Sequence, residues 1–88
     1  MRVEDAQKIV KRPFVTERTF EQIERENKLC FIVEDRVNKR QIADAVQALY
    51  EVVVVSVNTA RTLKGKKAFV RLAPEFRAAD LATKLGLV

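Results

Sequence analysis

Two strand-forming segments on either side of a basic turn constrain this chain more than any other feature. Residues 52–57 are almost entirely valine and predict a strand, and an apolar run of this kind indicates burial on both faces. Gly65 supplies a turn, and residues 67–72 return as the second strand of a hairpin. In the returning strand the side chains expected to face inward are those of Ala68, Val70 and Leu72. The other face carries Lys67, Phe69 and Arg71.

The first 34 residues predict a strand, a helix and a second strand. Residues 1–15 show no clear periodicity, and we expect a short strand or an extended segment there, because Pro13 restrains Arg12 to an extended conformation. Thr16 can cap a helix that Asn27 ends. Residues 28–34 then form a strand whose two faces are both apolar, which predicts a central strand covered on both sides.

A second helix is expected between residues 38 and 51. Asn38 and Gln41 have the spacing of a capping box, and Val37 and Ile42 can form a hydrophobic staple around that cap. The apolar face of this helix is formed by Ile42, Ala45, Val46, Leu49 and Tyr50. This stripe is interpreted as core packing.

The tail, residues 73–88, reads as a short helix that Gly86 ends. Pro74 suits the first turn of this helix or a turn leading into it. The order is therefore β-α-β-α-β-β with a short C-terminal helix. We expect one layered α/β (α+β) domain over residues 1–88, with helices packed on a four-stranded antiparallel sheet.

Several classes of site are not expected from the composition. Cys30 is the one cysteine and the chain has no histidine, so no internal disulfide, zinc site or His-activated thiol is expected. Cys30 lies in an apolar run and should pack as a small hydrophobe. No apolar run approaches the length of about 20 residues that spans a membrane, so we expect a soluble, intracellular protein.

Acidic and basic residues are separated along the chain, which has a net charge of +5 and a pI near 9.7. Residues 52–74 contain no acidic residue, and their cations are Arg61, Lys64, Lys66, Lys67 and Arg71. Lys8, Lys11 and Arg12 add to these, whereas Glu17, Glu21, Glu24 and Glu26 crowd the first helix. A polyphosphate partner suits such a segment, because each cation that neutralises a phosphate releases a counterion. The alternative is a solvated hairpin whose lysines protect an edge strand from aggregation.

The segment "KGKKAFVRL" was compared with the signature strand of RNA-recognition motifs. Lys64-Gly65 and Ala68-Phe69-Val70 fit, but one residue is extra and Lys67 occupies the first stacking position. The segment therefore resembles this motif but does not match it. The hairpin is better suited to phosphates and RNA shape than to base stacking.

Four segments, taken together, resemble a known family. They are "KRPFVTER", the helix start "NKRQI" followed by Ala45-Val46, the strand end "VVSVNT", and "KKAFVRL". In this order and spacing they closely resemble large-subunit ribosomal protein L twenty-three over nearly the whole chain, and the tail "PEFRAADLATKLG" is similar to the archaeal branch.

The resemblance implies a four-stranded antiparallel α/β domain that binds domain III of 23S-type rRNA at the rim of the polypeptide exit tunnel. It places the chain in the cytoplasm, on the large ribosomal subunit beside ribosomal protein L twenty-nine. The implied partners at the tunnel exit are the signal recognition particle, nascent-chain chaperones and the protein-conducting channel. Bacterial members carry a long tunnel-lining loop, but here only "ARTLKGK" joins the last two strands, so the resemblance does not extend that role to this chain.

The resemblance also assigns roles by position. The rRNA contacts that it implies are Lys11, Arg12, Pro13, Thr16, Lys39, Arg40, Asn58, Thr59, Arg61, Lys64, Lys66 and Lys67. Glu17 falls where the family presents an acidic docking residue to exit-site factors. A first-turn carboxylate that stabilises its helix is an equally good interpretation of Glu17. No cofactor, metal or catalytic residue is implied.

Two other functions fit parts of the sequence. A free-standing RNA-binding module would share the basic face and act away from the ribosome. A small ferredoxin-like enzyme, such as an acyl phosphate hydrolase, could bind an anion through Arg12 and position water through Asn58. That enzyme would need a glycine-rich phosphate loop, and the two glycines of this chain, Gly65 and Gly86, do not form one.

Overall fold

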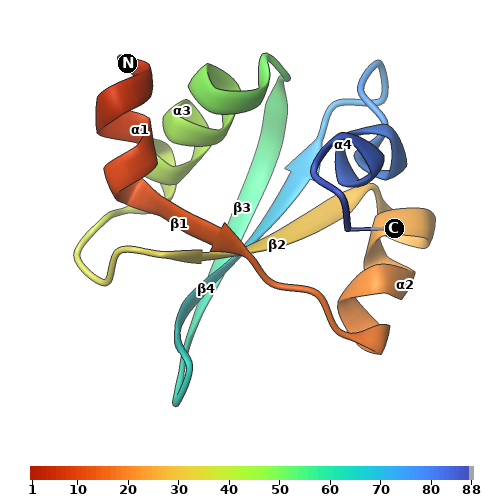
Figure 1. The fold of residues 1–88 in the computed structure, drawn as a ribbon, viewed down its shortest axis with the longest axis horizontal. Helices are drawn as coiled ribbons and strands as arrows, with labels where there is room; N and C mark the ends of the chain where they lie inside the picture. Colours follow the sequence, from red (N-terminus) through yellow and green to blue (C-terminus); the bar gives the residue numbers. More distant parts are fainter. Residues whose placement is uncertain (88) are drawn as a thin grey trace.

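The computed structural model describes residues 1–87 and confirms the expected α+β architecture (Figure 1). Within those residues the elements are α1 (Val3–Ile9), β1 (Val10–Pro13), α2 (Glu17–Glu26), β2 (Lys28–Val33), α3 (Lys39–Tyr50), β3 (Val54–Thr62), β4 (Gly65–Leu72) and α4 (Ala78–Lys84). The strands form one antiparallel sheet in the order β1-β2-β4-β3.

One hydrophobic core lies on a single face of the sheet. Alternate residues of β2, β4 and β3, including Phe31, Val70 and Val57, meet residues from each described helix there. Phe31 stacks on Tyr50 of α3 with ring centroids 5.7 Å apart. Figure 1 shows α1 beside α3 and α2 beside α4, while the end of the β3–β4 hairpin projects away from the helices. The core therefore lies on one face of the sheet, and α2 also reaches the margin of the other face, where Arg18 and Gln22 lie beside Phe69.

The prediction of a central strand over residues 28–34 is confirmed. β2 lies between β1 and β4, and every residue from Leu29 to Val33 is buried. Leu29, Phe31 and Val33 belong to the core. Cys30 and Ile32, on the opposite face, are also buried, and their cross-strand partners on β4 are Phe69 and Lys67.

The valine strand differs from expectation. β3 begins at Val54, runs on to Thr62 and lies at the edge of the sheet. Val53 is 47% exposed and Val55 is 56% exposed, so the prediction of burial on both sides is wrong. An edge strand has a neighbour on one side alone, and the register shift between Val54 and Ser56 turns Val55 out of the core. The inward and outward alternation predicted for β4 is confirmed.

The N-terminal helix α1 was not expected from the sequence. Ala6 is its one buried side chain, and it is fully buried against the core where α1 packs on α3. Glu4 in the first turn and Lys8 in the last turn complement the helix dipole. A helix of seven residues with a single buried alanine carries no periodic apolar signal, and tertiary contact with α3 decides its structure.

Both predicted capping sites are confirmed. The backbone N–H of Gln41 donates to Asn38 Oδ1 at 2.8 Å, and the N–H of Asn38 donates to Gln41 Oε1 at 2.9 Å. Thr16 and Thr19 form the equivalent reciprocal pair at the start of α2. The tail helix α4 starts at Ala78, and Pro74 lies in the turn that leads into it, the second of the two positions expected for this proline. Gly86 ends it with φ of +74°, while Val88, the last residue of the predicted tail, lies outside the described residues.

Asn27 joins two distant parts of the chain. It ends α2 in the left-handed region, with φ of 56° and ψ of 37°. Its Nδ2 lies 3.1, 3.3 and 2.9 Å from the carbonyl oxygens of Leu72, Ala73 and Phe76. Its Oδ1 accepts a hydrogen bond from the backbone N–H of Ala78 at 2.6 Å, which caps the start of α4. One side chain thus fixes the β4–α4 connection against the α2–β2 junction.

Replacing Asn27 should destabilise the fold strongly. Asn27→Ala removes about three net hydrogen bonds of about 1 kcal/mol each and places alanine in a left-handed conformation, so we expect a loss of about 3 to 4 kcal/mol. Asn27→Gly keeps the backbone conformation and should recover about 1 kcal/mol of this. Urea denaturation measures both. Asn58→Ala, an exposed asparagine on β3, is the matched control and should cost under about 0.5 kcal/mol. Equal losses at the two positions would contradict the role of Asn27.

The burial of Cys30 predicts a pH dependence of stability. Burial raises the pKa of this thiol from 9.0 to about 11, and the Lys67 ammonium partly offsets that rise. As the pH rises through 9.0 the unfolded thiol ionises while the folded thiol keeps its proton. The folded state then binds more protons, so the unfolding free energy should fall between pH 9.0 and about 11.

Cys30→Ala isolates this effect. Tyr50, whose pKa is also raised by burial, titrates in both proteins and cancels in the difference. We expect the wild-type advantage over Cys30→Ala to shrink by up to about 2 kcal/mol across this pH range. Chemical denaturation at each pH measures the difference. Parallel stability curves for the two proteins would show that the thiol is not desolvated in the folded state.

Candidate nucleic-acid interface

The sheet face opposite the core is the first part of the candidate interface, and we call it the open face. Cross-strand partners share a face, so the register defines its members. They are Arg12, Phe14, Lys28, Cys30, Ile32, Ser56, Asn58, Ala60, Lys67, Phe69 and Arg71. Arg12, Asn58 and Arg71 are exposed there, over a floor of buried Cys30 and Ile32.

Phe14 holds two lysine ammonium groups above the open face. Lys67 Nζ lies 4.0 Å from the centroid of the Phe14 ring, and Lys64 Nζ lies 5.5 Å from it. Both distances are within the range of cation–π attraction, which holds the ammonium groups near the ring and leaves their N–H donors available. The two lysines come from the hairpin and the phenylalanine from the end of β1, so the sheet brings them together.

A depression of about 460 Å³ lies beside this cluster. Its lining residues are Phe14, Thr16, Arg18, Thr19, Gln22, Lys64, Lys67 and Phe69. Three of them are cations, two are aromatic, and none of the described lining residues is a carboxylate. Such a combination can hold a phosphate and pack against the sugar or base attached to it. Phe14 and Arg18 were not predicted as site residues from the sequence. The one sequence feature that could have indicated them is their position close to Arg12-Pro13.

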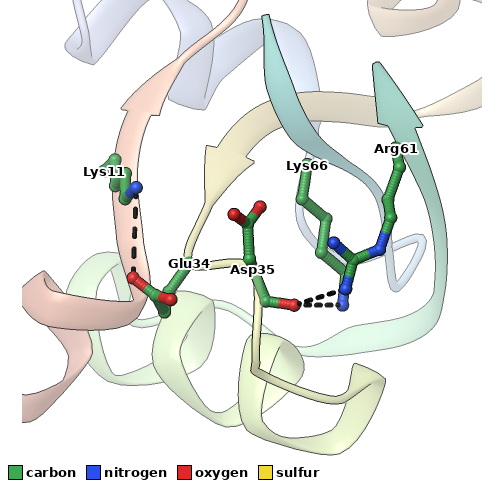
Figure 2. A network of polar contacts seen from close by, with 5 residues as sticks. All are labelled: Lys11, Glu34, Asp35, Arg61 and Lys66. Carbon is green, nitrogen blue, oxygen red and sulfur yellow. Dashed lines mark hydrogen bonds and ion pairs between the residues drawn. The ribbon is translucent and has the colours of Figure 1, made fainter. Parts of the chain in front are cut away.

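Arg61 and Lys66 lie on the other face of the same hairpin. Arg61 Nη donates to the Asp35 carbonyl oxygen at 3.2 Å, and Lys66 Nζ lies 3.4 Å from the same oxygen. Lys66 Nζ also donates to the carbonyl of Val37 at 2.7 Å. Figure 2 shows the two cations converging on Asp35, with its carboxylate turned away. The hydrogen bonds of Arg61 and Lys66 thus hold the β2–α3 loop against the hairpin. This structural role does not require RNA.

Lys39 and Arg40, also predicted as rRNA contacts, are the first two residues of α3. Both are exposed, and they line a depression of about 200 Å³ with Ala43 and β3. Because β3 is an edge strand, this cationic pair lies beside unpaired backbone groups.

The remaining predicted contacts differ in availability. Lys11 is exposed but lies 4.0 Å from Glu34 as a weak ion pair, which Figure 2 also shows. Pro13 and Thr59 are half-buried, and Thr59 lies opposite Ala68 on the core face of the sheet. Thr16 is exposed, but its hydroxyl is engaged in the α2 capping box.

Glu17, the predicted docking residue, is exposed in the first turn of α2. Both interpretations of this carboxylate therefore remain compatible with its position: it complements the helix dipole, and it is available to a partner.

The predicted site residues thus form two groups. One group lies on or above the open face and consists of Arg12, Asn58, Lys64 and Lys67. The other lies on the opposite side and consists of Arg61, Lys66, Lys39 and Arg40. The end of the hairpin, which carries Arg61, Lys64, Lys66 and Lys67, projects away from the helices (Figure 1). Cations therefore surround a projecting hairpin instead of lining one flat patch.

The geometry does not support the acyl phosphate hydrolase. Arg12 lies on β1 and Asn58 on β3, the two outer strands, with β2 and β4 between them. Three strand spacings place them about 14 Å apart, too far to hold one small anion and its attacking water together.

Across residues 1–87, no helix has the length and apolar character needed to cross a bilayer.

Comparison with known proteins identifies relatives of the chain. The family model of Ribosomal protein L23 matches residues 8–80. "Large ribosomal subunit protein uL23" of Dictyostelium discoideum is 49% identical over 85 residues, which cover 96% of this chain and 50% of the relative. The protein of the same name from Puccinia graminis is 51% identical over 85 residues, or 96% of this chain and 54% of the relative.

A third relative, "Large ribosomal subunit protein uL23B" of Caenorhabditis elegans, is 46% identical over 85 residues, or 96% of this chain and 58% of the relative. The chain thus spans about half the length of the curated relatives that it matches. The family match covers the hairpin and the "KRPFVTER" segment that form the interface. The chain belongs to the ribosomal protein L23 family.

Proposed function

We propose that this chain is a structural constituent of the large ribosomal subunit in the cytoplasm and binds large-subunit rRNA. The observation that carries the proposal is the distribution of charge on the fold. Lys64 and Lys67 sit on Phe14 above the open face, Arg61 and Lys66 occupy the opposite side of the hairpin, and the segment that supplies them contains no carboxylate. Relatives that are about half identical are named as large-subunit proteins, which supports a structural rather than an enzymatic role.

The rRNA contacts in this proposal are those implied by the family resemblance, with Phe14 added as a positioning residue. Their partner is domain III of 23S-type rRNA at the rim of the polypeptide exit tunnel. Phosphate contacts dominate such binding, because most of these residues are cations and the one aromatic residue that faces outward on β4, Phe69, is half-buried.

Glu17 and the acidic outer surface of α2 are proposed to face away from the RNA. In this arrangement they offer a docking site for the signal recognition particle, nascent-chain chaperones and the protein-conducting channel. Ribosomal protein L twenty-nine would be the protein neighbour. The separation of acids on α2 from cations on the hairpin supports this division, since carboxylates would be repelled by rRNA.

A free-standing RNA-binding module is the second candidate. The open face would serve it equally well, because a short RNA could lie across the same cations. The family match favours the ribosome, where the partner is a large folded RNA.

The double variant Lys64→Ala/Lys67→Ala tests the proposal. Each lost phosphate contact should lower the slope of log K against log salt by about 0.7 to 0.9, so the pair should lower it by about 1.4 to 1.8. Filter binding to a large-subunit rRNA transcript over a range of KCl concentrations measures the slope. Lys64 is exposed and Lys67 is half-buried, and within the described residues neither side chain makes a hydrogen bond or an ion pair, so thermal stability should stay close to that of the wild type.

Arg25→Ala/Arg36→Ala is the matched control, since it removes two exposed cations that are not among the proposed rRNA contacts and should leave the slope nearly unchanged. Arg61→Ala/Lys66→Ala removes two further proposed contacts from the hairpin and should lower the slope. It should lower thermal stability as well, because it releases the loop at Asp35 and Val37. Two results would contradict the proposal: a wild-type chain that does not bind the transcript, or an unchanged salt slope for Lys64→Ala/Lys67→Ala.

A further inference from the structure

A second depression on the open face lies at the end farthest from the hairpin turn. It has a volume of about 670 Å³, and its lining residues are Asn27, Val55, Ser56, Arg71, Leu72, Pro74 and Arg77. None of them is among the rRNA contacts that the family resemblance implies. Its size falls in the range of about 300 to 1,000 Å³ that is usual for ligand sites.

The two arginines are the charged groups of this depression. Arg71 and Arg77 are exposed, and within residues 1–87 neither guanidinium makes an ion pair or a hydrogen bond to another residue. Glu24, Glu75 and Asp80 line neighbouring depressions with Arg77, but none of these described carboxylates is paired with it. The depression itself has no carboxylate among its described lining residues.

The other lining groups define what these arginines can hold. Asn27 uses its amide nitrogen and oxygen in the structural hydrogen bonds described above, so anion binding falls to the arginines. A guanidinium binds phosphate through two parallel N–H donors. Ser56 is the cross-strand partner of Arg71 and adds an exposed hydroxyl, and Val55 with Pro74 adds apolar surface suited to a ribose.

Arg71 lies in line with the lysine cluster. It is on the same face of β4 as Lys67 and four residues further along, which corresponds to about 14 Å in a strand. Phe69 lies between them on that face. An RNA strand that follows β4 would therefore meet cations at both ends of the open face.

We propose that Arg71 and Arg77 form a second phosphate-binding subsite, which holds a nucleotide of the same RNA that Lys64 and Lys67 contact. This inference rests on the proposed function. It extends the RNA path from the hairpin end, across the open face, to the start of α4.

The test compares two double variants for binding to the large-subunit rRNA transcript over a range of KCl concentrations. Arg71→Ala/Arg77→Ala should lower the salt slope by about 1.4 to 1.8, as expected for two lost phosphate contacts. Arg77 makes no side-chain capping bond to α4, so the variant should remain folded, which circular dichroism checks. Arg25→Ala/Arg36→Ala removes two exposed arginines that do not line the depression, and it should lower the slope by less than half as much.

The outcomes separate this inference from the proposed function. If Lys64→Ala/Lys67→Ala lowers the slope while Arg71→Ala/Arg77→Ala behaves like the arginine control, the second subsite does not exist and the proposed function stands. If the wild type does not bind the transcript, both fail. Polyglutamate is the second probe: loss of its binding to Arg71→Ala/Arg77→Ala, with an unchanged rRNA slope, would assign the arginines to an acidic protein segment and overturn the proposal.

Discussion

The side chain of Asn27 is the constraint on which the arrangement of this domain depends. It ends α2 in a left-handed conformation, bonds the chain that leaves β4, and caps the start of α4. A short tail helix with few buried residues has little stability of its own. Through Asn27, α4 is fixed beside α2 on the core side of the sheet, and the same bonds fix the ends of β2 and β4 relative to each other.

This placement of the helices determines the functional surface. Because each described helix packs residues into the core on one side, the opposite sheet face consists mainly of strand side chains, with α2 at its margin. The hairpin end projects away from the helices (Figure 1). Cys30 and Ile32 form a buried apolar floor, and Phe14 positions the lysine heads above it. The cations are thereby held on a rigid sheet, so little side-chain freedom is lost when a phosphate binds.

Much of the fold could be predicted from local chemistry. The capping pairs that begin at Thr16 and Asn38 act within four residues, and the alternation in β4 follows from the two-residue period of a strand. Helix α1 and the exposure of Val55 could not be predicted. Their structure depends on contacts with α3 and on the position of β3 at the sheet edge, which the local sequence does not encode.

The candidate site was predicted in composition but not in arrangement. Lys66 and Lys67 are adjacent in a strand and so must point to opposite faces, a consequence of strand geometry that separates the cations into two groups. Phe14 carries no sequence signal because its role depends on lysines about 50 residues away. Arg71 was noted as a cation of the acid-free segment, but its pairing with Arg77 in one depression requires the folded tail.

The central claim is that this chain is a stably bound component of the large ribosomal subunit. Sucrose-gradient sedimentation of a cell lysate at low and at high salt, with detection of this chain, tests it most directly. The account predicts that the chain travels with the large subunit and stays there after a high-salt wash, because folded rRNA holds it through many phosphate contacts at once. A chain that runs free at the top of the gradient at both salt concentrations would contradict the claim and point to a small RNA as the partner.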